Sequence, residues 1–323
     1  MSDPPLVSVI CTCFNQGKYV SDALNSILLQ QYPNLELFVI DNGSQDDSSK
    51  SIEKWVQKHK EELEIGTFYY RDSQNYCWAF NQALFKSRGK YVVDLAADDF
   101  LHPGHIRTAV DTLQGSNAAA YFSNALLMDE KGRTQAFYSL DKRGNLRQKV
   151  PQGDIYALLV RKYILCTATL VFDAGCLKEE GGYDERLSYE DFDIIVRLSR
   201  KHDFVFHEHI GITKRILKKS YSAQQYLARN SVMLPSTYRI CRKIQAMNKT
   251  PEEKEALKHR VMHETKHALA SANFETAEKF LGLAADLEIS GFTYRLYRMW
   301  KRTGMDLSAL YRKWQHVRKG LNR

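Results

Sequence analysis

Residues 89 to 99 read GKYVVDLAADD, and this stretch decides the fold. Its apolar part, residues 91 to 95, predicts a strand buried inside a sheet. Asp98 and Asp99 follow where that strand ends. Adjacent carboxylates repel each other unless a cation or a proton neutralises one of them, and oxygen ligands suit Mg²⁺ or Mn²⁺. The alternative is a solvated acidic turn or a helix cap before Pro103.

The sequence before this stretch alternates between strand and helix patterns. We expect strands at residues 6–13, 35–40 and 65–70, and helices at residues 20–28, 46–60 and 76–87. Strands that alternate with helices at this spacing predict a right-handed, doubly wound, mostly parallel α/β sheet. Because ligands bind beyond the carboxyl ends of the strands in such sheets, the loops that hold Asn15, Asp41 and Asp98 are expected to form the site.

The pattern changes in the second half of the chain. Strands are expected at residues 118–128, 134–138, 167–172 and 204–209, and a helix at residues 154–161. From about residue 220 helical periodicity dominates, interrupted at Pro235, Pro251, Gly291 and Gly304. We therefore expect an α/β domain over residues 1–219 and a helical C-terminal region over residues 220–323.

Charge and apolar content limit the class of protein. The formal net charge of +8 is compatible with nucleic acid, an anionic membrane or a phosphorylated substrate as partner. The basic residues form no aromatic stacking platform or reading helix, so nucleic acid is not expected. No apolar run is long enough to span a membrane, and residues 1 to 5 lack a signal-peptide layout, which predicts a cytoplasmic location.

Two further acidic segments are candidates for ligand binding or catalysis. Asp41 opens the loop DNGSQD, where its carboxylate is suited to accept the imide N–H of uracil or thymine or the ribose hydroxyls; a turn with a helix cap is the alternative. Residues 181 to 193 read GGYDERLSYEDFD and lead into an amphipathic helix. The helix dipole favours acidic residues at that end, but capping explains one carboxylate and not five.

These phrases together resemble the family 2 inverting glycosyltransferases, which have the nucleotide-diphospho-sugar transferase (GT-A) fold. The resemblance rests on the phrases VSVI to Asn15, VIDNGSQD, GKYV to Asp98-Asp99, and GYDE to Glu190-Asp191, in the same order over residues from about 6 to 220. It implies transfer of a sugar from a nucleotide diphosphate to an acceptor hydroxyl, in cell-surface polysaccharide or glycan synthesis. It also implies Mn²⁺ or Mg²⁺ as cofactor and a UDP-sugar as donor, with dTDP-sugars or GDP-sugars as the alternative donors.

The resemblance also assigns roles to single residues. Asp191 is the expected general base, and the expected metal ligands are Asp98, Asp99 and His209. Donor binding is expected from Thr12, Phe14, Asn15, Asp41, Asn75, Asn81, Asp98 and Arg215. The acceptor is expected beside Gly182, Tyr183, Asp184 and Glu190.

The chain departs from the family pattern at four positions. Ala96 stands where the first Asp of the D-x-D motif is usual, and Phe80 where an Arg is usual. Asn42 replaces a frequent acidic residue, and the usual Pro before the loop Asn is missing from the stretch Thr12-Cys13-Phe14-Asn15. A catalytically weak or inactive sugar-nucleotide or carbohydrate-binding protein of the same fold is therefore the alternative. A nucleotidyltransferase is disfavoured because the loop after the first strand holds only one glycine, Gly17.

Histidines and lysines near residue 210 have two interpretations each. Strand alternation places His207 and His209 on one face, where one of them completes the metal site or both line a polar sheet face. Arg215, with Lys214, Lys218 and Lys219, either clamps the leaving diphosphate or forms a solvated basic loop.

The C-terminal tail combines basic and apolar residues in helical spacing. Its nine Lys and Arg residues are opposed only by Asp306, and Tyr, Trp, Leu and Met are interleaved with them. This pattern is typical of helices that lie on anionic membranes, which would suit a lipid-linked glycan acceptor and a peripheral position on the inner membrane face. A packed helical lid or a homodimer contact is the alternative.

Overall fold

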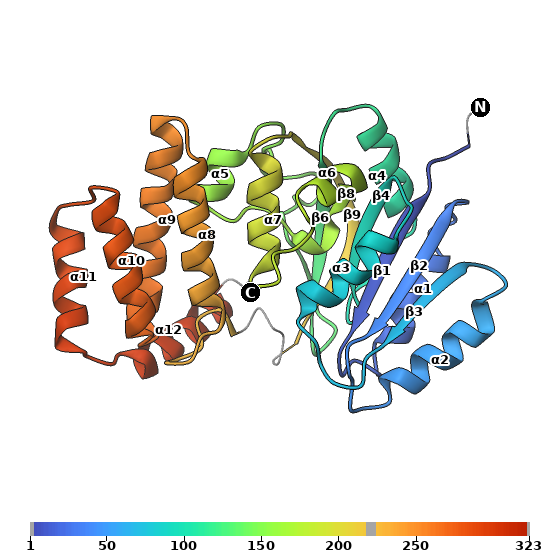
Figure 1. The fold of residues 1–323 in the computed structure, drawn as a ribbon, viewed down its shortest axis with the longest axis horizontal. Coiled ribbons are helices and arrows are strands. Elements are labelled where there is room, and N and C mark those ends of the chain that lie inside the picture. The colour runs from blue at the N-terminus through green and yellow to red at the C-terminus, as the bar shows by residue number, and fades with distance from the viewer. Residues whose placement is uncertain (1–2, 218–223, 322–323) are drawn as a thin grey trace. The chain divides into compact units, whose positions relative to one another are not determined.

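The computed structural model describes residues 3–217 and 224–321, with side chains described up to residue 314 (Figure 1). The chain divides into two compact units. The first unit comprises Met1–Ile155, Leu165–Glu185 and Arg197–Leu217, and the second comprises Tyr156–Ile164, Arg186–Val196 and Lys218–Arg323. Two short segments within the first 219 residues thus belong to the second unit, and a domain boundary at residue 219 stays a prediction.

The first half of the chain alternates strand and helix as its apolar pattern predicts. The elements are β1 (Val7–Cys13), α1 (Val20–Leu28), β2 (Leu35–Asp41), α2 (Ser48–His59), β3 (Glu64–Tyr69), α3 (Tyr76–Lys86) and β4 (Tyr91–Ala96). β1 pairs in parallel with both β2 and β4, and β2 pairs in parallel with β3. The parallel half of the predicted sheet is therefore confirmed.

The remaining strands extend this sheet with mixed directions. They are β5 (Phe100–Leu101), β6 (Ala120–Asp129), β7 (Thr134–Ala136), β8 (Val171–Asp173) and β9 (Phe204–Ile216). In the described residues the strand order is β3-β2-β1-β4-β8-β6-β9-β5, and β7 pairs with β6 at the side. β8 is antiparallel to β4 and to β6, whereas β6 and β9 are parallel.

Two local predictions differ from the structure. The strand expected at residues 167–172 begins as a 3₁₀ turn at Thr167–Thr169 (η1), because both the backbone N–H and the hydroxyl of Thr169 bond to the Cys166 carbonyl. The sequence patterns also missed helix α4 (His105–Gln114), although Ile106, Val110 and Leu113 have helical spacing and are buried.

The core explains why the carboxyl ends of the parallel strands stay open. Val7, Val9 and Cys11 of β1 pack in one cluster with residues of α1 and α2, such as Leu24 and Trp55. The opposite side of β1 carries Ile10, which is also fully buried, and α3 contacts β1 and β2. Each buried side chain of this size contributes about 1.5–3 kcal/mol, so the helices are fixed by the sheet faces and leave the strand ends to the loops.

The second unit is helical, as predicted for the described part of the C-terminal region (Figure 1). It contains α5 (Tyr156–Arg161), the start of α7 (Glu190–Ser199), α8 (Met233–Met247), α9 (Pro251–Ala270), α10 (Phe274–Asp286), α11 (Phe292–Thr303) and α12 (Ser308–Leu321). α6 (Ala174–Glu179) belongs to the first unit. Among the described residues, no helix is both long and apolar enough to span a bilayer.

The predicted breaks in this region fall at helix ends or in a first turn. Pro251 is the first residue of α9, after an N-cap made by Thr250 with a reciprocal bond from Glu253. Gly291 and Gly304 flank α11. Pro235 lies in the first turn of α8, where its missing N–H removes no helical hydrogen bond.

Candidate functional site

Four loops meet at the carboxyl edge of the parallel strands. β1, β2 and β4 end in register, with Thr12 opposite both Ile40 and Ala96. The Thr12 hydroxyl is buried at this edge and has no hydrogen-bond partner within the described residues. An unsatisfied buried hydroxyl at a strand end is a place where a ligand or a water completes the hydrogen bonding.

Asn15 joins the loop after β1 to the loop after β2. Its backbone is left-handed, with φ of 55°. Its side-chain carbonyl accepts a hydrogen bond from the Gln45 N–H at 2.7 Å, and its own N–H donates to the Ser44 hydroxyl at 2.9 Å. Asn15 therefore holds the two loops at a fixed separation, and the neighbouring Phe14 ring is 45% exposed beside them.

Asp41 lies at the end of β2 and is almost completely buried. Its Oδ1 accepts from the Ser44 N–H at 3.0 Å, and its Oδ2 accepts from the Ser49 hydroxyl. A carboxylate offers about four acceptor positions, so this arrangement leaves capacity for a ligand N–H or hydroxyl. The turn-and-cap interpretation of the Asp41 loop and the ligand interpretation are thus compatible.

The loop after β3 is fixed to the loop after β2 by Asn42. The Asn42 side chain donates to the Gln74 carbonyl at 3.0 Å and accepts from the Gln74 N–H at 2.9 Å. Asn75 caps α3 by accepting from the Trp78 N–H at 3.1 Å. Asn42 takes the place of an acidic residue in the family pattern. Its side chain fixes these two loops to each other.

Asp98 and Asp99 lie directly beyond β4. Burial raises the pKa of Asp98, and the side chain of Gln16 is one of the groups that oppose this shift. Burial, followed by repulsion from Asp98, raises the pKa of Asp99 to about 7. One Asp99 oxygen accepts from the Arg215 N–H at 2.8 Å. A cation beside these two carboxylates would relieve their repulsion.

Arg215 connects β9 to the Asp98 loop and is only 11% exposed at its side chain. The guanidinium donates to the Asp98 carbonyl at 2.7 Å and to the Asp22 carboxylate at 2.6 Å, and it lies over the rings of Tyr19 and Phe100. In this arrangement Arg215 is held by protein groups. The accompanying cations expected at Lys218 and Lys219 lie outside the described residues.

The donor set fits a metal that shares its ligands with a phosphate. The described residues include no group of three or more His, Cys, Asp or Glu side chains arranged to hold a metal. Mg²⁺ and similar ions usually bind one or two carboxylates, several waters and substrate phosphates. Asp98 and Asp99 match that mode and do not match a metal cage made by protein alone.

His209 belongs to a different group of side chains. Its ring nitrogens lie 3.1 Å from the Tyr121 hydroxyl, 3.0 Å from His207 Nδ1 and 3.4 Å from His105 Nδ1. His209 lies six positions before Arg215 in β9, which is about 20 Å along a strand. The structure therefore does not bring His209 to Asp98, and the polar-face alternative describes the paired histidines better.

Asn81 positions the expected acceptor loop. Its side chain donates to the Tyr183 carbonyl at 2.9 Å and to the Glu185 carboxylate at 3.1 Å, and accepts from the Tyr183 N–H at 3.0 Å. Gly182 has φ of +70°, and a Cβ there would lie 2.4 Å from Asn81 Oδ1. In this structure the Asn81 amide is used by the loop, and its donor-binding role stays a prediction.

Asp94 is a site residue that sequence reasoning missed. It accepts hydrogen bonds from the hydroxyls of Tyr76, at 2.7 and 2.8 Å, and Tyr183, at 2.7 Å. The available signal was a carboxylate inside an apolar strand, on the same face of β4 as Ala96. Asp94 therefore joins the loop that holds Tyr183 to the strand that leads to Asp98 and Asp99.

Asp191 lies in the first turn of α7, in the second unit. Its Oδ2 accepts from the Tyr163 hydroxyl at 2.8 Å, and its Oδ1 accepts from the Phe192 N–H at 2.7 Å. Glu190 and Asp184 are partly exposed. Tyr163 is a second partner that the sequence did not indicate, because it comes from a separate segment of the same unit.

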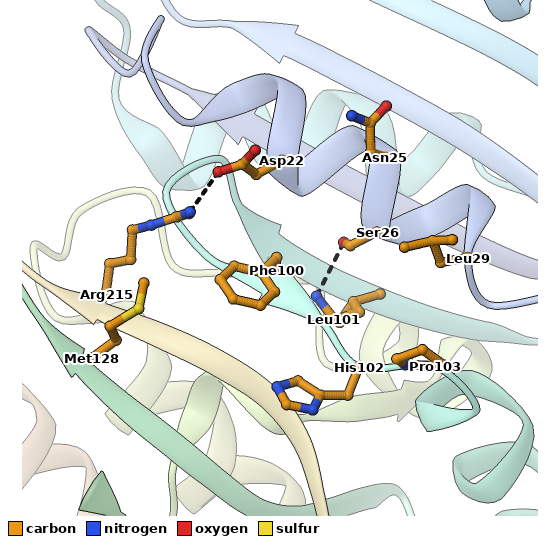
Figure 2. A pocket seen from close by; sticks show the side chains of 10 residues that line it. All are labelled: Asp22, Asn25, Ser26, Leu29, Phe100, Leu101, His102, Pro103, Met128 and Arg215. Carbon is orange, nitrogen blue, oxygen red and sulfur yellow. Dashed lines mark hydrogen bonds and ion pairs between the residues drawn. The ribbon is translucent and has the colours of Figure 1, made fainter. Parts of the chain in front are cut away.

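A pocket of about 520 Å³ opens beside α1 in the first unit (Figure 2). It is lined by Asp22, Asn25, Ser26, Leu29, Phe100, Leu101, His102, Pro103, Met128 and Arg215. Figure 2 shows two interactions among these residues, the Asp22–Arg215 ion pair and the bond from the Leu101 N–H to the Ser26 hydroxyl. Its lining includes one predicted site residue, Arg215, which also bonds to the Asp98 carbonyl of the loop after β4.

Comparison with known sequences agrees with these features. Residues 8–155 match the family model described as Glycosyl transferase family 2. An uncharacterized glycosyltransferase of Rickettsia typhi is 25% identical over 215 residues, which are 66% of this chain and 64% of the relative. Chondroitin synthase of Escherichia coli is 26% identical over 199 residues, 60% of this chain and 26% of that protein. The chain thus spans less than two thirds of the length of these relatives.

Solved structures show the same fold. TarS 1–349 of S. aureus in complex with UDP-GlcNAc has a TM-score of 0.70 at 13% identity, covering 97% of this chain and 92% of that one. The mannosyltransferase PcManGT of Pyrobaculum calidifontis, in complex with GDP-Man and Mn²⁺, has a TM-score of 0.57 at 18% identity, covering 96% and 86%. The chain therefore carries a glycosyl transferase family 2 domain and has the GT-A fold.

Proposed function

We propose that this protein transfers a sugar from a nucleotide-diphosphate sugar to an acceptor hydroxyl with inversion at the anomeric carbon. The observation that carries the proposal is the set of loops at one edge of the sheet, which presents Thr12, Asn15, Asp41 and Asp98 together. One relative, chondroitin synthase, is named for polysaccharide synthesis and supports a glycan acceptor, in cell-surface polysaccharide or a lipid-linked precursor.

The nucleoside is proposed to bind between the loops after β1 and β2. The exposed Phe14 ring offers a face for a base, and buried Asp41 offers an acceptor for the imide N–H of uracil. UDP is therefore the preferred nucleotide. TarS was solved with UDP-GlcNAc and PcManGT with GDP-Man, so dTDP and GDP remain candidates for the same loops.

Asp98, assisted by Asp99, is proposed to hold Mn²⁺ or Mg²⁺ together with the donor diphosphate. When bound, the metal would stabilise the negative charge of the leaving nucleotide diphosphate. Arg215 orients the loop by holding the Asp98 carbonyl. Its guanidinium is paired with Asp22, and release from that ion pair would free it to clamp a phosphate oxygen of the leaving diphosphate.

Asp191 is proposed as the general base. It takes the proton from the acceptor hydroxyl while the acceptor oxygen bonds to the anomeric carbon and the bond from that carbon to the diphosphate oxygen breaks. Only one carboxylate is needed and no enzyme nucleophile intervenes, which gives inversion. Tyr163 fixes one oxygen of Asp191 by its hydrogen bond.

The decisive experiment measures donor binding and donor turnover separately. Calorimetry with UDP-, dTDP- and GDP-sugars and Mn²⁺ identifies the nucleotide, and release of the nucleotide diphosphate reports turnover. Asp98→Asn should abolish metal-dependent binding and turnover, whereas Asp47→Asn, at an exposed carboxylate on the neighbouring loop, should change neither. Binding without turnover over a broad acceptor panel would favour the sugar-nucleotide-binding alternative, and absence of any nucleotide binding would refute the proposal.

A further inference from the structure

Helix α11 has an apolar face that no other described part of the chain covers. None of its residues is buried. Phe292, Leu296 and Met299 are 82%, 40% and 57% exposed. Their spacing of three and four residues places them on one stripe of the helix. A stripe of large apolar side chains in water is costly, so its presence on a folded unit indicates a surface that meets a partner.

The opposite side of α11 is the side that packs on its own unit. The Tyr294 hydroxyl donates to the Leu281 carbonyl at 3.4 Å, and Lys301 forms an ion pair with Glu278, both on α10. Tyr294 and Lys301 are seven residues apart and therefore share a face about half a turn from Leu296. The packing that holds α11 in place thus directs the apolar stripe outward.

Positive charge borders this stripe. Arg295 and Arg302, again seven residues apart, lie on one flank and are exposed, and α11 contains no acidic residue. The acid that follows, Asp306, is bound by Arg229 at 2.5 Å. α12 adds exposed Leu310 next to Arg312 and Lys313.

We infer that the exposed stripe of α11, with Arg295 and Arg302, docks on an anionic lipid surface. Helices that lie in a membrane interface combine an apolar stripe with Lys and Arg along its edges, whose long side chains reach the headgroups. Because α11 is about 18 Å long, it lies in the plane of the interface rather than across it. This inference does not depend on the proposed transfer reaction.

The test uses the whole chain and vesicle sedimentation. Vesicles of phosphatidylcholine mixed with phosphatidylglycerol should bind the protein at low ionic strength, and pure phosphatidylcholine vesicles should bind it weakly. Arg295→Gln with Arg302→Gln should lower the partition coefficient about 25-fold, since each basic residue near such a surface contributes about fivefold. Leu296→Ser with Met299→Ser should also lower it.

Matched variants test whether vesicle binding depends on this surface or only on the charge and apolar content of the whole protein. Lys54→Gln with Lys58→Gln makes the same change of charge on exposed α2, and Phe85→Ser removes an exposed apolar side chain on α3. Both controls should bind vesicles like the parent protein. Equal loss in the controls, or no vesicle binding by the parent, would overturn the inference. Concentration-dependent self-association that Leu296→Ser with Met299→Ser abolishes, without lipid binding, would identify a second copy as the occupant instead.

Discussion

The hydroxyl of Tyr183 donates a 2.7 Å hydrogen bond to Asp94 Oδ2. Tyr183 belongs to the acceptor loop, and Asp94 to the strand that leads to Asp98 and Asp99. The Tyr183 ring also packs on Phe80 of α3, with centroids 4.5 Å apart. The position of the loop that holds Tyr183 thus depends on a half-buried carboxylate two residues before Ala96. Ala96 is the position where the family motif usually has its first acid.

Tyr183→Phe should therefore weaken acceptor use more than donor use. A hydrogen bond to a charged group contributes about 1.5–3 kcal/mol, so its loss should loosen the acceptor loop. In steady-state kinetics we expect a several-fold higher KM for acceptor, with little change in the donor dissociation constant. Tyr76→Phe is the control, because it leaves the Tyr183–Asp94 bond in place. An unchanged acceptor KM would show that the loop does not need this bond.

Gly43→Ala should disrupt the donor loops. Gly43 has φ of +77°, and a Cβ there would lie 2.4 Å from the backbone of Asp72 and Ser73. Gly132 has nearly the same φ, +78°, but a Cβ there would have no atom of the described residues within 4 Å. Gly132→Ala therefore isolates the backbone strain, which is about 1–2 kcal/mol. Titration with UDP should show lost affinity in Gly43→Ala alone. Similar losses in both variants would mean that the loop contact is unimportant.

Asp191→Asn should lower kcat and retain donor binding. An amide cannot take the acceptor proton, and a positioned base typically accelerates a reaction about 10²–10⁴-fold. Rapid-quench assays with saturating donor and acceptor should show a loss in this range, while calorimetry shows an unchanged donor affinity. Tyr163→Phe, which removes the bond to Asp191 Oδ2, should have a smaller effect. Full activity in Asp191→Asn would exclude this residue as the base.

Ala96→Asp should strengthen metal binding. The substitution places a carboxylate opposite Thr12, whose buried hydroxyl lacks a partner in the described chain, and two residues before Asp98. A further oxygen ligand favours Mn²⁺ or Mg²⁺. Competition with a fluorescent chelator in the presence of UDP should reveal tighter Mn²⁺ binding than in the parent protein. Weaker binding would show that the site is built for fewer carboxylates.

Stability should fall below about pH 6.5 through His105. Burial, followed by the nearby His209 and His102, lowers the pKa of His105 to about 3, and burial, followed by His207, lowers that of His209 to about 4. A histidine whose folded pKa lies below its unfolded value of about 6.5 favours folding above that pH. Its contribution to the free energy of unfolding is lost, by about 1.4 kcal/mol per pH unit, as the pH falls toward the folded pKa.

The variant His105→Asn isolates this effect. Its free energy of unfolding, measured by urea titration, should be lower than that of the parent protein at pH 7.5. The difference should shrink as the pH falls from about 6.5 toward 5. Asp99, whose pKa is raised, has a pH dependence of opposite sign, and it cancels because both proteins contain it. A difference independent of pH would show that His105 does not titrate on unfolding.

Local pattern predicted much of the fold. The strands and helices from β1 to β4 follow from apolar spacing in consecutive residues, and so do the helices of the C-terminal region. η1 was misassigned because Thr169 satisfies its backbone within the turn, which apolar spacing does not encode. The candidate donor residues Asn15, Asp41 and Asp98 were indicated because they follow predicted strands of a parallel sheet.

The sequence by itself thus determined the alternation of strands and helices, the sheet edge that carries the acidic loops, and the amphipathic tail, because each is encoded by neighbouring residues. Only the tertiary structure decided which side chains bond to each other. Asp94 meets Tyr183 across 89 positions, and Arg215 meets Asp22 across 193. His209 joins His105 rather than Asp98. Such pairs depend on strand register and on the packing of distant segments, which no local periodicity contains.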